Sequence, residues 1–121
     1  MRTDLPLLRK ASPLLAGLTL TVSLVACGTT TVHRTMAATY VGTGSGFYPT
    51  TITVDKKDEV IIRVGNGTDK THGFSIEGYR VHKTVDPNQT IQVKFRAKRA
   101  GTFKIYCQLH PTHQTAVLQV Q

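Results

Sequence analysis

The chain has 121 residues, with 15 lysines and arginines against 7 acids and a formal net charge of +8. This length predicts one small domain rather than several. No Ser-His-Asp set, carboxylate pair or phosphate-binding loop is recognisable, which argues against an enzyme that works without a metal.

The N-terminal segment has the layout of a secretory signal. Three basic residues precede an apolar run from residue 11 to residue 26, and this run is shorter than the about 20 apolar residues that a membrane-spanning helix needs. It closes with Leu-Val-Ala-Cys at 24–27, which resembles the bacterial lipobox, whose cysteine is lipidated and becomes the first mature residue. We therefore predict a signal peptide over residues 1–26 and a lipid on Cys27. Ordinary cleavage near Ala26 is the alternative.

Such a signal places the protein outside the cytoplasm, lipid-anchored to the outer face of the cell membrane or in the periplasm. The mature chain keeps 12 basic and 6 acidic residues, a net charge of +6. This balance favours acidic partners or anionic lipid headgroups, with a solvated sheet face as the alternative. Because an exported chain rarely meets nucleic acid, we expect no nucleic-acid partner.

The first mature residues lack an apolar period and are rich in threonine, so residues 27–39 are predicted to be the lipidated cysteine and a flexible tether. A flexible glycine-rich turn is expected over residues 42–46. From residue 47 the pattern is that of β-strands throughout. Strands are expected at 50–54, 59–64, 90–97, 102–107 and 116–120, with short apolar pieces at 74–76 and 79–81. The sequence thus predicts an all-β domain over residues 40–121, a Greek-key β-sandwich or barrel of about seven to eight strands.

Residues that bind metals concentrate in Cys107–His113, a C-x2-H-x2-H run. Strand alternation places Phe103, Ile105 and Cys107 on the core side, and Pro111 stiffens the loop that follows. With Cys27 lipidated, Cys107 has no partner cysteine in the mature chain, and an unpaired exported thiol is a hazard unless it is buried, dimerised or bound to metal. One thiolate and two imidazoles suit copper or zinc. A zinc finger is disfavoured because no second ligand pair has zinc-finger spacing.

A histidine in an upstream loop, followed late in the chain by Cys-x2-His, resembles the cupredoxin family from about Phe47 to Val120. The ligand loop has the short spacing of amicyanin-like cupredoxins, with His113 where they carry an axial methionine. The segments 72–76 and 107–111 are still more similar to nitrosocyanin, a red copper protein. Nitrosocyanin supplies a glutamate where this chain has a histidine at 72, and its last histidine lies in a longer loop.

The resemblance implies one mononuclear copper ion held by His72, Cys107 and His110, with His113 as the fourth, axial ligand. A nitrogen donor in place of a thioether is expected to bind Cu(II) more strongly and to favour the oxidised state. His82 is expected to be a surface residue and is the reserve fourth ligand.

The resemblance also implies electron transfer, a non-enzymatic role, with a redox partner such as a cytochrome or an oxidase. A copper chaperone or copper-sequestering protein, which would hand the ion to a copper-accepting protein or store it, is the alternative. Redox catalysis on a small molecule needs an open coordination position, and four protein ligands argue against one.

Overall fold

The structure, a computed structural model, describes residues 28–121, so the predicted signal peptide and Cys27 lie outside the described residues. No helix among the described residues is long and apolar enough to cross a membrane. Nine strands make up the described fold: β1 (Thr31–Val41), β2 (Gly44–Tyr48), β3 (Thr51–Val54), β4 (Glu59–Asn66), β5 (His72–Ile76), β6 (Val81–Val85), β7 (Thr90–Arg96), β8 (Gly101–Tyr106) and β9 (Ala116–Val120).

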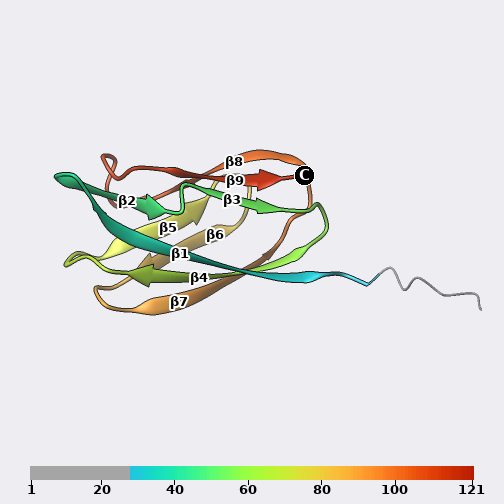
Figure 1. Cartoon of the computed structure of the whole chain (residues 1–121), viewed down its shortest axis with the longest axis horizontal. Coiled ribbons are helices and arrows are strands. Elements are labelled where there is room, and N and C mark those ends of the chain that lie inside the picture. The colour runs from blue at the N-terminus through green and yellow to red at the C-terminus, as the bar shows by residue number, and fades with distance from the viewer. Residues whose placement is uncertain (1–27) are drawn as a thin grey trace, which may run out of the picture.

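The strands form two sheets that pack face to face (Figure 1). One sheet has the order β2-β1-β4-β7 and the other the order β3-β9-β8-β5-β6. The pairs β1·β4 and β3·β9 are parallel, and the remaining pairs are antiparallel. The predicted all-β sandwich is confirmed, with nine strands in the described part of the chain rather than seven to eight.

The core lies between the two sheets and follows the alternation seen in the sequence. In β4, Val60, Ile62 and Val64 are fully buried whereas Arg63 is exposed. Successive side chains of a strand point to opposite faces, so this alternation directs one face of β4 into the core. The largest fully buried side chains come from both sheets: Phe47, Phe74, Met36, Ile62, Ile76, Ile105, Leu118, Val60, Val64, Val85, Val93 and Val120.

The tether predicted over residues 27–39 is wrong from Thr31 onward. These residues form β1, which pairs in parallel with β4 from Thr31↔Glu59 to Ala38↔Asn66. Only Met36 and Ala38 of β1 are fully buried. The strand is held mainly by its ladder with β4, a partner distant in sequence that a local pattern does not reveal.

The flexible turn predicted over residues 42–46 is also wrong in part. Gly42 turns the chain with a φ of 60°, but Gly44–Tyr48 forms β2, which pairs with the end of β1. A Cβ at Gly46 would lie 2.7 Å from Cβ of Gln114. Glycine at this position therefore allows β2 to approach the end of the loop that follows β8.

Met36 tests whether β1 belongs to the folded core. We expect Met36→Ala to lower the free energy of unfolding by about 2–5 kcal/mol, the usual cost of truncating a buried methionine, as measured by urea denaturation of residues 28–121. Thr35→Ala, at the neighbouring exposed position, is the matched control and should change stability by less than about 0.5 kcal/mol. Equal stability of the two variants would mean that the segment does not pack against the core.

Candidate metal centre

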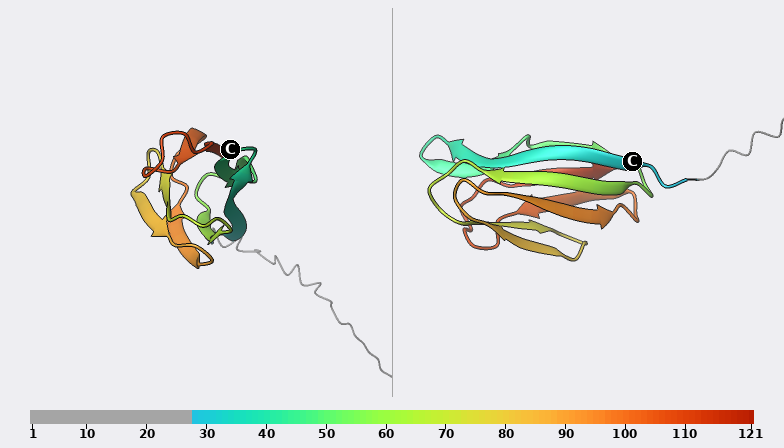
Figure 2. Two further views of the ribbon diagram at one scale, coloured as in Figure 1. Left: turned by 90° about the vertical axis from the view of Figure 1, so that its left-hand side faces the viewer. Right: turned by 90° about the horizontal axis from the view of Figure 1, so that it is seen from below.

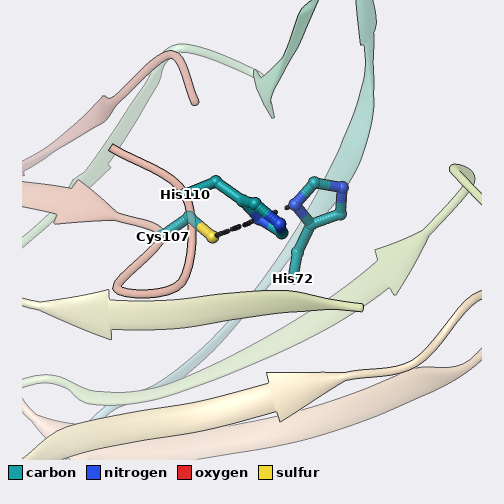
Figure 3. A group of neighbouring side chains, drawn as sticks. All are labelled: His72, Cys107 and His110. Carbon is teal, nitrogen blue, oxygen red and sulfur yellow. Dashed lines mark hydrogen bonds between the residues drawn. The ribbon is translucent and has the colours of Figure 1, made fainter. Parts of the chain in front are cut away.

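Three of the predicted ligands meet at one end of the sandwich. The donor atoms of His72, Cys107 and His110 all lie within 4.8 Å of one another, and Figure 3 shows the three side chains converging. His72 is the first residue of β5, whereas Cys107 and His110 lie in the loop after β8. The fold thus brings together ligands that are about 35 positions apart in sequence.

The spacing of the donor atoms suits a shared metal ion. Cys107 Sγ lies 3.9 Å from His72 Nδ1 and 3.5 Å from His110 Nδ1. Bonds of about 2.0 Å from metal to imidazole nitrogen and about 2.3 Å to thiolate sulfur place two such donors roughly 3.5–3.7 Å apart. Small side-chain movements would therefore satisfy both bonds.

The orientation of His72 is set by a short chain of hydrogen bonds. Asn66 donates through Nδ2 to the carbonyls of Lys70 (2.7 Å) and Val85 (2.8 Å), so its Oδ1 is an acceptor. Thr68 donates its hydroxyl proton to that Oδ1 at 2.7 Å and therefore accepts from Nε2–H of His72, also at 2.7 Å. The proton is held on Nε2, and the lone pair of Nδ1 faces the cluster.

Cys107 is held against the start of β5. Its side chain is 5% exposed, and the backbone N–H of Gly73 donates to Sγ at 3.1 Å. A Cβ at position 73 would overlap the side chain of Gln108. Gln108 in turn accepts from the Ser75 hydroxyl at 2.6 Å and donates to the Lys83 carbonyl at 3.0 Å, so the ligand loop is tied to both β5 and β6.

His113 lies beside this three-residue cluster. Its ring centroid is 4.7 Å from that of His72 and 4.4 Å from that of Phe47. Nδ1 donates to the carbonyl of Gln114 at 3.1 Å, so the lone pair is on Nε2. That atom is buried and has no hydrogen-bond partner among the described residues. An unpaired buried acceptor is costly, and a metal ion would supply its missing partner.

Burial keeps the imidazoles of His72 and His113 neutral and able to bind a metal. Burial first, and then the charge of the neighbouring His72, lower the pKa of His113 to about 4, while the hydrogen bond to Gln114 opposes the shift. The pKa of His72 is lowered by burial first, and then by the charges of His110 and Lys70. At neutral pH the ring lone pairs are therefore free of protons.

The other histidines lie outside the cluster. His82 is an exposed residue of β6 whose Nδ1 is 3.0 Å from the Ser75 hydroxyl, in agreement with the surface position expected for it. His33 is an exposed residue of β1. The sequence reasoning did not find the role of Thr68 and Asn66. The Asn-Gly-Thr run shortly before His72, which favours a side-chain-stabilised turn, was the available signal.

Comparison with known proteins assigns the family. The cupredoxin-like domain family matches residues 16–120. The chain belongs to this family. The cofactor of a cupredoxin-like domain is one copper ion, and the arrangement of His72, Cys107 and His110 suits such an ion.

Individual relatives show the range of cupredoxin-like proteins. Subunit 2 of the cytochrome c oxidase of Thermus thermophilus is 31% identical over 62 residues, which cover 51% of this chain and 45% of that protein. The chain spans less than half the length of the curated relatives that it matches. Among solved structures, auracyanin A of Chloroflexus aurantiacus, a "blue" copper protein, matches with a TM-score of 0.62 at 18% identity. The match covers 75% of this chain and 99% of the auracyanin chain.

A second solved structure is the metal-binding domain of a Cu(I)-exporting P-type ATPase of Streptococcus pneumoniae. It has a TM-score of 0.65 at 14% identity, with 75% of this chain and 86% of that chain covered. At these identities the two structures support the cupredoxin fold alone.

Thr68 is predicted to act through His72. Thr68→Val removes the hydroxyl that accepts from Nε2–H and should weaken copper binding about 10- to 100-fold, the usual effect of losing a partner of a metal ligand, as measured by competition with a chelator. Thr68→Ser should restore most of the affinity. Thr71→Val, in the same loop and facing Asp86 instead, is the matched control, and an equal loss in that variant would contradict the role of Thr68.

The lowered pKa of His113 predicts a pH-dependent stability of the metal-free protein. An unfolded imidazole titrates near 6.5 and the folded one at about 4, so between these values the unfolded chain holds more protons. The contribution is fully present above about pH 6.5 and is lost as the pH falls towards 4, on the order of 3 kcal/mol in all.

Urea unfolding at pH 7 and pH 4.5 measures this effect. His113→Leu should lose less stability between the two pH values than the unsubstituted protein does. His33→Leu removes an exposed histidine of β1 and serves as the control, which should behave like the unsubstituted protein. Parallel pH profiles for all three proteins would show that His113 titrates normally.

Proposed function

We propose that this protein is an exported, membrane-anchored mononuclear copper protein that transfers electrons, with His72, Cys107, His110 and His113 as ligands. The observation that carries the proposal is the convergence of three donors within 4.8 Å beside a buried, unpartnered Nε2 of His113. When bound, copper would supply a one-electron couple between Cu(I) and Cu(II).

The protein's own contribution is to hold the donors in place. The Thr68 hydroxyl fixes the ring of His72, the Gly73 N–H fixes the sulfur, and the Gln114 carbonyl fixes the ring of His113. Each contact comes from the protein's own backbone or side chains. Donors held in this way move little when the charge of the ion changes, which suits electron transfer better than a loosely held set.

A route to a partner is supported by the surface around His110. This residue is only partly buried, and Gln108, two positions before it in the loop, is exposed. Leu109, Tyr40 and Val41 are 46%, 57% and 41% exposed, and Tyr40 shares a cavity of about 380 Å³ with His72 and His110. An apolar rim near a half-exposed ligand favours docking of a redox protein. The similarity to a cytochrome c oxidase subunit supports a cytochrome or an oxidase as that partner.

Export and anchoring rest on the sequence before the described residues. The basic head, the short apolar run and the Leu-Val-Ala-Cys segment support a lipid on Cys27. Such an anchor would confine the protein to a membrane surface, where respiratory partners lie.

Copper handling is the second candidate. The cavity that includes His72 and His110 offers an acceptor protein access to the ion, and the fold is shared with the copper-binding domain of a Cu(I) exporter. Fast, reversible exchange of Cu(I) with a chelator would favour this role. A tightly held ion that cycles between two redox states would favour electron transfer.

Optical and EPR spectra of residues 28–121 loaded with Cu(II) test the ligand set. We expect an intense thiolate-to-copper absorption that disappears in Cys107→Ser, because the band requires a sulfur ligand. His113→Ala should keep the band but shift it, and should lower the affinity for Cu(II). His82→Ala, which removes a histidine outside the cluster, should leave the spectrum unchanged.

Other outcomes would change the assignment. A colourless protein that binds only Cu(I) or zinc would favour copper handling or a structural ion. A spectrum that changes in His82→Ala and not in His113→Ala would make His82 the fourth ligand.

A further inference from the structure

A second charged feature lies away from the copper site. A groove of about 520 Å³ runs between the β5–β6 turn and the residues of β7 and the turn after it. Its lining contains five cationic residues and no acid: Arg80, Lys94, Arg96, Lys98 and Arg99. All five are exposed, so the groove presents a concentrated positive surface that neither copper binding nor the core explains.

This surface lies towards the end of the sandwich opposite the copper site. Arg96 lies opposite Glu59, the first residue of β4, in the β4·β7 ladder. Asn66, the last residue of β4, is hydrogen-bonded to the loop that leads to His72. Eight residues of β4 separate the two ends, a distance of roughly 25 Å at about 3.4 Å per residue.

The described chain begins at this same end, as Figure 2 shows. Gly28, Thr29 and Thr30 line a smaller cavity together with Lys56, Lys57 and Arg96. The carbonyl of Thr30 accepts from the N–H of Glu59 at 2.9 Å, so the chain is fixed to β4 from there onward. Only residues 28–30 separate Cys27 from β1, a reach of at most about 10 Å.

We name the cations at this end the basic pole: Lys56, Lys57, Arg80, Lys94, Arg96, Lys98 and Arg99. Four acids share this end, Asp55, Asp58, Glu59 and Glu77, which leaves an excess of three positive charges. Asp58 is buried and its carboxylate already accepts from the N–H of Asp55. Near the copper site, by contrast, Lys70 and Lys83 are balanced by Asp69 and Asp86.

We propose that the basic pole docks on anionic lipid headgroups and turns the copper end away from the membrane. The proposal rests on the proposed anchor at Cys27. A lipid on that residue would bring the part of the pole that lines the cavity with residues 28–30, namely Lys56, Lys57 and Arg96, to about 10 Å from the headgroups, which is comparable to the Debye length at physiological salt. Lysine and arginine side chains at that distance are attracted by the negative surface potential of a bilayer.

A protein partner for electrons does not fit the same surface. Such a partner must approach the copper, and the pole lies at the opposite end of the molecule. The basic pole lies close to residue 28, where the described chain begins, and this position favours the membrane as its binding partner. Several cations spread over two cavities also suit a surface of many phosphates better than a single small anion.

Lysine footprinting of the full chain in vesicles tests the proposal. The chain is incorporated into phosphatidylcholine vesicles with or without 30% phosphatidylglycerol and treated with an amine-reactive reagent. Modification at each lysine is then followed by mass spectrometry. In the anionic vesicles Lys56, Lys57, Lys94 and Lys98 should react several-fold more slowly, whereas Lys70 and Lys83 should be unaffected. High salt should remove the protection, because it screens the charges.

A matched pair of variants isolates the charge effect. Lys98→Gln with Arg99→Gln should weaken the docking equilibrium, read from the protection of Lys94, by about fivefold for each charge removed. Lys70→Gln with Lys83→Gln removes the same charge at the copper end and should leave the protection of Lys94 unchanged. Far-UV circular dichroism checks that both variants fold.

Three outcomes would overturn the proposal. One is equal modification in both kinds of vesicle, and another is equal protection of Lys70 and Lys83. The third is protection of the pole by millimolar inorganic phosphate in vesicles without anionic lipid, which would indicate a small-anion site. Protection of the pole in a protein whose Cu(II) spectrum lacks a thiolate band would refute the electron-transfer function while leaving the membrane docking intact.

Discussion

The copper site depends on one close approach, between the backbone at the start of β5 and the sulfur of Cys107. The N–H of Gly73 donates to Sγ, and the absence of a side chain at Gly73 leaves room for Gln108. Any larger residue at 73 would push the ligand loop away from β5. Because His72 directly precedes Gly73, this one backbone contact sets the positions of both the sulfur and the first imidazole. A hydrogen bond to a thiolate also stabilises its charge in a buried site.

The rings of His72 and His113 are directed by contacts on the side facing away from the cluster. Thr68 accepts the proton of Nε2 in His72, and the Gln114 carbonyl accepts that of Nδ1 in His113. In both rings the other nitrogen therefore carries a lone pair that can bind a metal ion. Burial and the mutual repulsion of the rings lower the pKa of His72 and His113, so protonation does not compete with metal at neutral pH. The hydrogen bonds therefore set which nitrogen of each ring faces the cluster, and burial keeps that nitrogen unprotonated.

The sequence predicts most of the fold because most strands carry their own signal. The alternation of β4 and the β-branched run of β3 are local, and the structure has strands at both. The segment Thr31–Val41 has no such signal, since only two of its side chains are fully buried and its ladder joins residues far apart in sequence. Likewise the glycines of β2 suggest flexibility, although Gly46 is needed for close packing against Gln114. His72, Cys107 and His110 are recognisable because chemistry restricts which residue types bind copper. Thr68 and Asn66 act only through geometry, which a pattern of residue types does not contain.

The strand that the sequence failed to predict also determines how the site is oriented. β1 runs the length of its sheet, with Thr30 bonded to Glu59 at one end and the Ala38 carbonyl accepting from the Gly67 N–H at the other. Gly67 lies between Asn66 and Thr68, the two residues that orient His72. The point where the chain leaves the domain is thus connected to the copper site by a continuous ladder of hydrogen bonds. A flexible tether would let the copper end face any direction, but a strand that begins four residues after Cys27 fixes the site at the far end of the domain. With a lipid on Cys27, as proposed, the β1·β4 pairing would place the copper site at the end of the domain far from the anchor, and docking of the basic pole would then set the direction in which that end faces.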